Sequence, residues 1–126
     1  MKLIFASANQ NKIDEIISIM PKQINLISLK DINFTGDISE TENTFEGNAL
    51  IKAQFASKKW DSNAFADDSG LVVNALNGQP GVFSARFAGE PKNDNANNLK
   101  LLNELYSIKD RSAYFVTVMA LIWENE

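Results

Sequence analysis

The N-terminal half of the chain shows two kinds of hydrophobic pattern, which together predict a strand, a helix and a second strand. Residues 2–6 form a short apolar run of strand-forming residues, and residues 24–29 alternate as a strand does. Between these runs, the apolar side chains that recur at helical spacing are Ile13, Ile16, Ile17 and Met20. Pro21 ends that helix. This order of elements implies a right-handed crossover onto a sheet.

A longer amphipathic pattern follows the polar segment 31–43. Thr44 has the side chain of an N-cap residue, and the apolar positions that follow are Phe45, Ala49, Ala53, Ala56 and Trp60. This spacing predicts a helix. Residues 63–66 and 71–76 then predict two short strands, joined by an Asp-Asp-Ser-Gly turn at 67–70.

The last third of the chain predicts a loop, a helix and one long strand. Glycine and proline punctuate residues 77–91, which indicates a loop shaped by its backbone. Helical spacing in segment 94–106 is carried by Leu99, Leu102 and Leu105. Residues 111–123 are a run of β-formers with no partner sequence after them. The edge of that strand is left unsatisfied unless another chain covers it.

Composition and charge narrow the class of protein. The chain has 126 residues, of which 44% are hydrophobic, and this suits a single α/β domain over residues 1–126. Sixteen acidic and twelve basic residues give a net charge of −4, the wrong sign for binding a long nucleic-acid backbone. No segment has the roughly 20 apolar residues that span a bilayer. We therefore expect a cytoplasmic protein without nucleic-acid or membrane partners.

Cysteine and histidine are both absent from the sequence. Their absence excludes disulfides, thiolate nucleophiles and cysteine–zinc sites, and it removes the commonest general base. Hydrolytic chemistry in this chain would therefore use carboxylates together with a hard cation such as Mg²⁺.

A candidate phosphate-binding segment lies where the first strand leads into the first helix, and it reads Ser7-Ala8-Asn9-Gln10-Asn11-Lys12. Backbone N–H groups, short polar side chains and the Lys12 ammonium meet there at the positive end of a helix dipole, which attracts phosphate. The glycines of a Walker loop are missing, and a plain asparagine-rich turn is the alternative interpretation.

Carboxylates at two places could hold a cation. Glu40 precedes the helix that starts after Thr44 and is not explained by it, whereas capping and solubility explain Glu46. Asp67 and Asp68 follow an apolar strand, where adjacent side chains point in different directions. One of them could cap the turn while the other faces a cleft. Ordinary turn chemistry is the alternative for this pair.

Arg86 is the candidate anion-binding residue of the loop 78–89, which glycine and proline frame on both sides. Arginine suits bidentate binding of phosphate or carboxylate. A surface ion pair is the alternative interpretation.

Taken in order, these stretches resemble the Ham1 family of inosine and xanthosine triphosphate pyrophosphatases. Residues 7–12 resemble the family's phosphate-binding Ser/Thr-x-Asn-x-x-Lys motif, and residues 44–53 resemble its acidic-turn helix. The most specific similarity is Ala-Asp-Asp-Ser-Gly-Leu at 66–71, followed by Pro-Gly-x-x-Ser-Ala-Arg at 80–86. The resemblance implies a mixed, twisted sheet with flanking helices, and a chain that usually assembles as a homodimer.

The resemblance also implies an activity, which is the Mg²⁺-dependent hydrolysis of non-standard purine nucleoside triphosphates (ITP, dITP and XTP) to the monophosphate and pyrophosphate. Asp68 is then the proton acceptor and a metal ligand, Glu40 a second ligand and Asp67 a weaker one. The residues implied to bind substrate are Ser7, Ala8, Asn9, Gln10, Asn11, Lys12, Lys52, Ser69 and Arg86. We expect the carboxylates of Glu40 and Asp68 to meet on one cation beside the segment ending in Lys12.

The sequence departs from the family pattern at its end. Family members continue beyond the long strand with a returning strand, a Gly-Phe-Gly-Tyr-Asp-Pro segment and a terminal Ser-His-Arg, which recognise the base. These elements are missing, so we expect the C-terminal part of the fold to be absent and the base preference stays open. Two alternatives remain. One is a nucleotide-binding or dimerisation fragment without activity, and the other is a Maf-like nucleotide pyrophosphatase, which the 67–70 and 84–86 stretches do not favour.

Overall fold

The structure is a computed structural model that describes all residues from 1 to 126. The chain folds into two compact units. The first unit comprises residues 1–67 and 118–126, and the second comprises residues 68–117. The elements in chain order are β1 (Lys2–Phe5), α1 (Gln10–Ile19), β2 (Asn25–Ser28), α2 (Phe45–Trp60), β3 (Ala64–Val73), the 3₁₀ helices η1 (Asn74–Leu76) and η2 (Gly81–Arg86), α3 (Asp94–Glu104) and β4 (Ala113–Ile122). None of these helices has the length and apolar character needed to cross a membrane.

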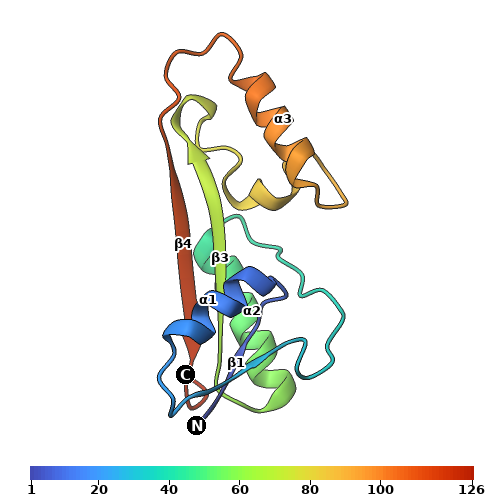
Figure 1. The fold of residues 1–126 in the computed structure, drawn as a ribbon, viewed down its shortest axis with the longest axis vertical. Helices are drawn as coiled ribbons and strands as arrows, with labels where there is room; N and C mark the ends of the chain where they lie inside the picture. The colour runs from blue at the N-terminus through green and yellow to red at the C-terminus, as the bar shows by residue number, and fades with distance from the viewer. The chain divides into compact units, whose positions relative to one another are not determined.

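The four strands form one sheet in the order β2-β1-β3-β4 (Figure 1). β1 pairs in parallel with β2 and with β3. Side-chain hydrogen bonds join Ser69 to Thr117 and Asn74 to Ser112, so residue numbers fall along β4 as they rise along β3. That pairing is antiparallel. The expectation of a mixed sheet with flanking helices is therefore confirmed.

The first unit has a hydrophobic cluster on each face of β1. On one face, Leu3, Phe5 and Phe65 pack against Ile13 of α1, and the Phe5 and Phe65 rings stack with centroids 4.5 Å apart. On the other face, Ile4 and small alanines of the strands pack against Ala53 and Ala56 of α2. Because side chains alternate along a strand, β1 can present one row to each helix. Most of the predicted core positions of α2 are therefore confirmed.

One expectation about β3 is wrong. The segment Asp67-Asp68-Ser69-Gly70 is not a turn between two short strands but the middle of the single strand β3, drawn as one arrow in Figure 1. Turn propensity is a local preference, and the pairing of β3 with β4, where Ser69 lies beside Thr117, overrides it. The strand then ends at Val73 and continues as the 3₁₀ helix η1 rather than reaching Leu76 as strand.

Helical spacing also predicted burial for several side chains that are exposed in the structure. Ile17, Leu99 and Leu102 have the spacing of core residues but are more than half exposed, at 54%, 62% and 55%. Each helix is covered by protein on only part of its circumference, so a periodic pattern can be wider than the face that is buried. In α3, the buried side chains of the helix and its C-cap are those of Asn97 and Leu105.

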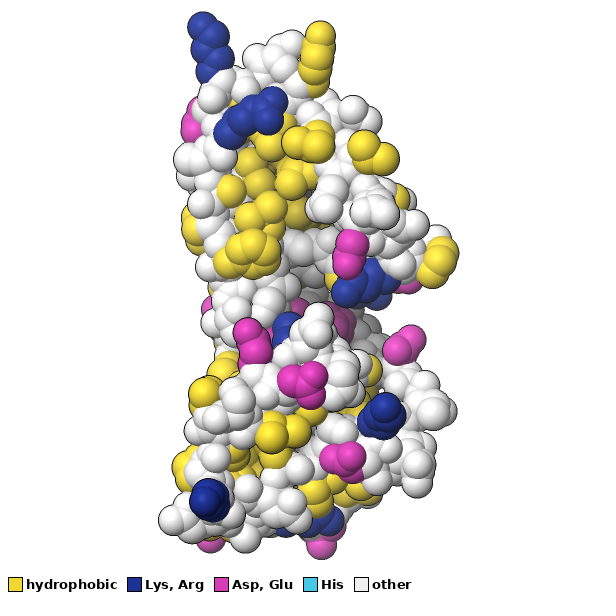
Figure 2. All heavy atoms as spheres, viewed as in Figure 1, with side chains coloured by type: hydrophobic (Ala, Val, Ile, Leu, Met, Phe, Trp, Pro, Cys, Tyr) yellow, Lys and Arg dark blue, Asp and Glu magenta, His cyan; other side chains and the backbone are white.

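The second unit exposes several large apolar side chains, which are Phe83, Leu99, Leu102, Tyr106, Tyr114 and Phe115 (Figure 2). β4 is the last strand in the sheet order. Along its first-unit portion, Met119 and Leu121 are also exposed. The edge of β4 therefore combines unpaired backbone groups with apolar side chains.

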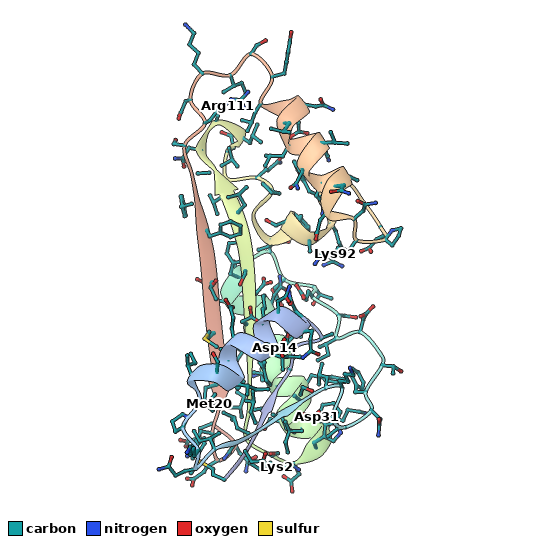
Figure 3. All side chains as sticks on the ribbon, viewed as in Figure 1. Lys2, Asp14, Met20, Asp31, Lys92 and Arg111 are labelled. Atoms are coloured by element: carbon teal, nitrogen blue, oxygen red, sulfur yellow. The ribbon has the colours of Figure 1, made fainter.

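The approach to β4 is held by two neighbouring residues of the second unit. The Arg111 guanidinium donates to the Leu105 carbonyl at 3.1 Å, at the end of α3 (Figure 3). Asp110 accepts hydrogen bonds from the hydroxyl and the backbone N–H of Ser112. These two bonds, the hydroxyl's first, lower the pKa of the exposed Asp110 carboxyl.

Substituting the N-cap of α2 tests how this helix is held. Thr44 accepts a hydrogen bond from the Gly47 N–H at 3.0 Å. We expect Thr44→Ala to lower the free energy of unfolding by about 1 kcal/mol, because a backbone donor loses its partner. Urea denaturation would measure the change. The exposed Thr41 is the matched control, and Thr41→Ala should stay within about 0.5 kcal/mol of the unchanged chain. Equal losses in both variants would contradict the capping role.

Candidate functional site

The candidate phosphate-binding segment forms a compact loop into α1. The Ser7 hydroxyl accepts from the Asn9 N–H at 3.1 Å, and the Asn9 side chain accepts from the Lys12 N–H at 3.2 Å as the helix N-cap. α1 begins at Gln10, so the last part of the predicted segment is the first helical turn. Ala8 to Asn11 are exposed. The positive end of the helix dipole is therefore open to an anion.

Lys12 joins this segment to β3. Its Nζ lies 2.5 Å from Oδ2 of Asp67, whose side chain is 6% exposed. β1 and β3 run parallel with Phe5 opposite Phe65, so the residues that follow Phe5 and those that follow Phe65 lie at the same end of the pairing. The first and third predicted motifs are thus in direct contact. Gln10 instead donates to Asp14 within its own helix, at 2.8 Å.

Glu40 and Lys52 form the second charged pair of the first unit. Glu40 Oε1 lies 3.4 Å from Lys52 Nζ, and the two side chains are 25% and 13% exposed. Glu40 comes from the loop that precedes α2, and Lys52 comes from the helix itself. This pair therefore resembles the first one, with one ammonium and one carboxylate in a partly buried place.

Asn48 is a residue of this region to which the sequence analysis assigned no role. Its side chain is 2% exposed in α2, accepts from the Glu42 N–H at 3.0 Å and donates to the Glu42 carbonyl at 3.1 Å. The only signal in the sequence was an asparagine next to the apolar Ala49, within the first turns of the predicted helix. Amphipathic patterning treats such an asparagine as solvent-facing, and so the signal was missed.

The remaining predicted residues of β3 belong to the second unit. Asp68 is 6% exposed, and the Ser69 hydroxyl lies 3.1 Å from that of Thr117 on β4. The side chain of Asp68 points away from the face of β3 to which Asp67 points, because the two are consecutive in a strand. In the alternation along β3, Asp68 belongs to the same set of residues as Ala64 and Ala66.

Arg86 lies at the end of η2, also in the second unit, and forms an ion pair. Its Nη1 is 3.4 Å from Glu90 Oε1, and both side chains are well exposed. The buried Asn97 of α3 donates to the Ala85 carbonyl at 2.9 Å and accepts from the Ala88 N–H at 2.7 Å, so it brackets Arg86. Sequence reasoning missed Asn97 for the same reason as Asn48.

The charged residues have the chemistry of a site for a polyanion and a hard cation. Lys12, Lys52 and the start of α1 supply positive charge, and Glu40 and Asp67 supply carboxylate oxygens. Within neither unit do three or more carboxylates gather as a metal cage. The meeting of Glu40 and Asp68 on one cation stays a prediction.

Comparison with known proteins shows close similarity along the whole chain. The dITP/XTP pyrophosphatase of Flavobacterium johnsoniae is 53% identical over 126 residues, which make up 100% of this chain and 66% of that protein. The structure of the Staphylococcus aureus Ham1 protein has a TM-score of 0.85 at 45% identity, covering 96% of this chain and 62% of that one. For the HAM1 protein of Coxiella burnetii, the TM-score is 0.86 at 40% identity, with 96% and 62% covered.

The chain therefore spans just under two thirds of the length of the relatives that it matches. The sequence pattern of the Ham1 family matches residues 3–126. This match and the similarity of the folds confirm the family resemblance drawn from the four motifs. The chain belongs to the Ham1 family.

Proposed function

We propose that this chain carries the phosphate- and metal-binding part of a nucleoside triphosphate pyrophosphohydrolase. The reaction would split ITP, dITP or XTP with water into the nucleoside monophosphate and pyrophosphate. The contact between Lys12 and Asp67 carries the proposal, because it joins a helix start suited to phosphate with a strand that bears two adjacent carboxylates. Relatives named dITP/XTP pyrophosphatase, 45–54% identical to this chain, support the same reaction.

Each candidate residue has a role in this proposal. Lys12 and the N–H groups at the start of α1 bind the triphosphate oxygens, and Lys52 adds a second ammonium. Asp68 accepts the proton of the water that attacks the α-phosphorus, and pyrophosphate leaves with the electron pair of the broken bond. Arg86 and Ser69 contact the substrate.

The donor set fits Mg²⁺. Glu40, Asp67 and Asp68 offer hard carboxylate oxygens, and the chain has no histidine or cysteine to select a softer metal. Magnesium is usually bound by one or two carboxylates together with the phosphates of the substrate, so a complete protein cage is not required. When bound, the ion would neutralise charge on the triphosphate and on the departing pyrophosphate.

We also propose that the protein is a cytoplasmic homodimer. The resemblance to the Ham1 family, which implies a homodimer, supports this assembly. A chain without cysteine fits a reducing compartment.

Pyrophosphate release tests the activity directly. The chain is incubated with Mg²⁺ and with ITP, dITP, XTP, GTP or ATP, and the pyrophosphate formed is measured over time. We expect release from ITP, dITP and XTP to be faster than release from GTP and ATP, and to stop when EDTA removes the metal. Nucleotide binding without release would favour the alternative of a binding fragment.

Asp68→Asn tests the proposed proton acceptor. The amide keeps the shape of the carboxylate but can neither accept the proton nor bring a negative charge to the metal, so kcat should fall by about 10²-fold or more. Steady-state kinetics with ITP would measure the change, and circular dichroism would verify the fold. Asp37→Asn, in the exposed loop before α2, is the matched control and should keep its kcat. Undiminished turnover in Asp68→Asn would refute the assignment.

Lys12→Ala tests triphosphate binding. Loss of a charge-assisted contact to phosphate should raise KM for ITP by about tenfold or more, with a much smaller change in kcat. The variant also loses the ion pair with Asp67, so its thermal midpoint should fall. Lys22→Ala removes an exposed lysine elsewhere in the first unit and should change neither quantity. An unchanged KM in Lys12→Ala would argue against this role.

A further inference from the structure

The loop that carries Glu40 is attached to α2 at two separate places, both within the first unit. At the first, the Phe34 ring packs against Phe55 and Trp60, with centroids 5.7 Å and 5.5 Å away. At the second, the backbone of Glu42 is bound by the side chain of Asn48. Glu40 lies between these two attachments. Its position therefore depends on them more than on any strand or helix of its own.

The Asn48 side chain binds Glu42 as a neighbouring β-strand would. One amide oxygen accepts from the Glu42 N–H, and the amide nitrogen donates to the Glu42 carbonyl. The donor and acceptor thus meet both polar groups of one residue, which fixes its orientation as well as its distance. Asn48 is almost fully buried, so water cannot replace either bond when the side chain is changed.

Gly47 makes this close approach possible. A Cβ atom at position 47 would lie 2.7 Å from Cβ of Glu42 and 2.8 Å from its Cγ, distances at which one of the groups must move. Glycine is a poor helix former, yet here it stands in the first turn of α2. The gap that it leaves allows Glu42 to lie against the helix within reach of Asn48.

The same face of α2 also holds the carboxylate of Glu40. Lys52 follows Asn48 by one helical turn, so the two side chains are neighbours on the helix surface. Asn48 holds the backbone of Glu42, while Lys52 pairs with Glu40 two residues earlier in the loop, at 3.4 Å. We propose that Asn48 is a positioning residue, which, with the gap at Gly47, holds Glu42 so that Glu40 stays against Lys52. The consequence for a metal ion at Glu40 rests on the proposed function.

The reactivity of Lys52 tests this inference without nucleotide or metal. The folded chain is treated with an acetylating N-hydroxysuccinimide ester, and mass spectrometry follows acetylation of Lys52 relative to the exposed Lys30. Asn48→Leu keeps about the size of the side chain but loses both the donor and the acceptor, and it brings no new charge beside Lys52. Gly47→Ala displaces Glu42 sterically. Both variants should acetylate Lys52 about threefold faster or more, as should Glu40→Gln, because the ion pair that shields the amine is lost. Gly47→Ala keeps the test available if Asn48→Leu does not fold.

A double variant separates positioning from general destabilisation. When Glu40→Gln is already present, Asn48→Leu should raise the Lys52 rate no further, because the partner to be positioned is gone. Ala56→Gly destabilises the same helix away from Glu42, and it should lower the unfolding midpoint without changing the Lys52 rate. Unchanged Lys52 rates in both Asn48→Leu and Gly47→Ala, or effects that multiply in the double variant, would overturn the inference. Failure to release pyrophosphate while these rates change would count against the proposed function alone.

Discussion

The ion pair between Lys12 and Asp67 is the interaction on which the arrangement of the first unit depends. A carboxylate that is only 6% exposed within a β-strand has lost most of its hydration, which costs several kcal/mol unless a cation lies close to it. Lys12 can supply that cation because β1 and β3 pair in parallel and α1 starts directly after the loop that leaves β1. The same contact places the anion-attracting start of α1 next to the Asp67 carboxylate of β3. Stability and candidate chemistry therefore depend on one contact.

Two loops with little regular structure are held by buried asparagines rather than by apolar contacts alone. Asn48 binds both backbone groups of Glu42 before α2, and Asn97 binds the backbone on both sides of Arg86 in the second unit. An amide suits this task because it offers one donor and one acceptor at a fixed distance. In each loop, the bound backbone lies within two residues of a charged side chain in the proposed site, Glu40 in one and Arg86 in the other. The positions of these two charged side chains are therefore set by asparagines of the neighbouring helices α2 and α3.

The alanines of α2 decide how close that helix lies to the sheet. Ala53 and Ala56 are fully buried against Ile4 and the strand alanines, where larger side chains would hold the helix further away. Membership of the Ham1 family accounts for the order of the four sequence motifs along the chain. The catalytic assignment depends instead on the chemistry of the individual residues.

Several features of this protein were determined by the sequence alone. Helical periodicity was sufficient for α1, α2 and α3, and runs or alternation of strand-forming residues were sufficient for β1, β2 and β4. The four motifs and their order were sufficient for the family. Absence of histidine and cysteine limited the candidate ligands to carboxylates.

Only the tertiary structure decided the continuity of β3 and the partners of the charged residues. The segment 67–70 has the composition of a turn, but pairing with the distant strand β4 makes it strand, and no local pattern contains that information. Lys12 meets Asp67 across a separation of 55 residues, and the role of Asn48 depends on where the loop before α2 returns. Local sequence specifies which backbone conformations a segment prefers. Contacts between distant segments, and the burial that makes a polar side chain seek a partner, arise only when the chain is folded.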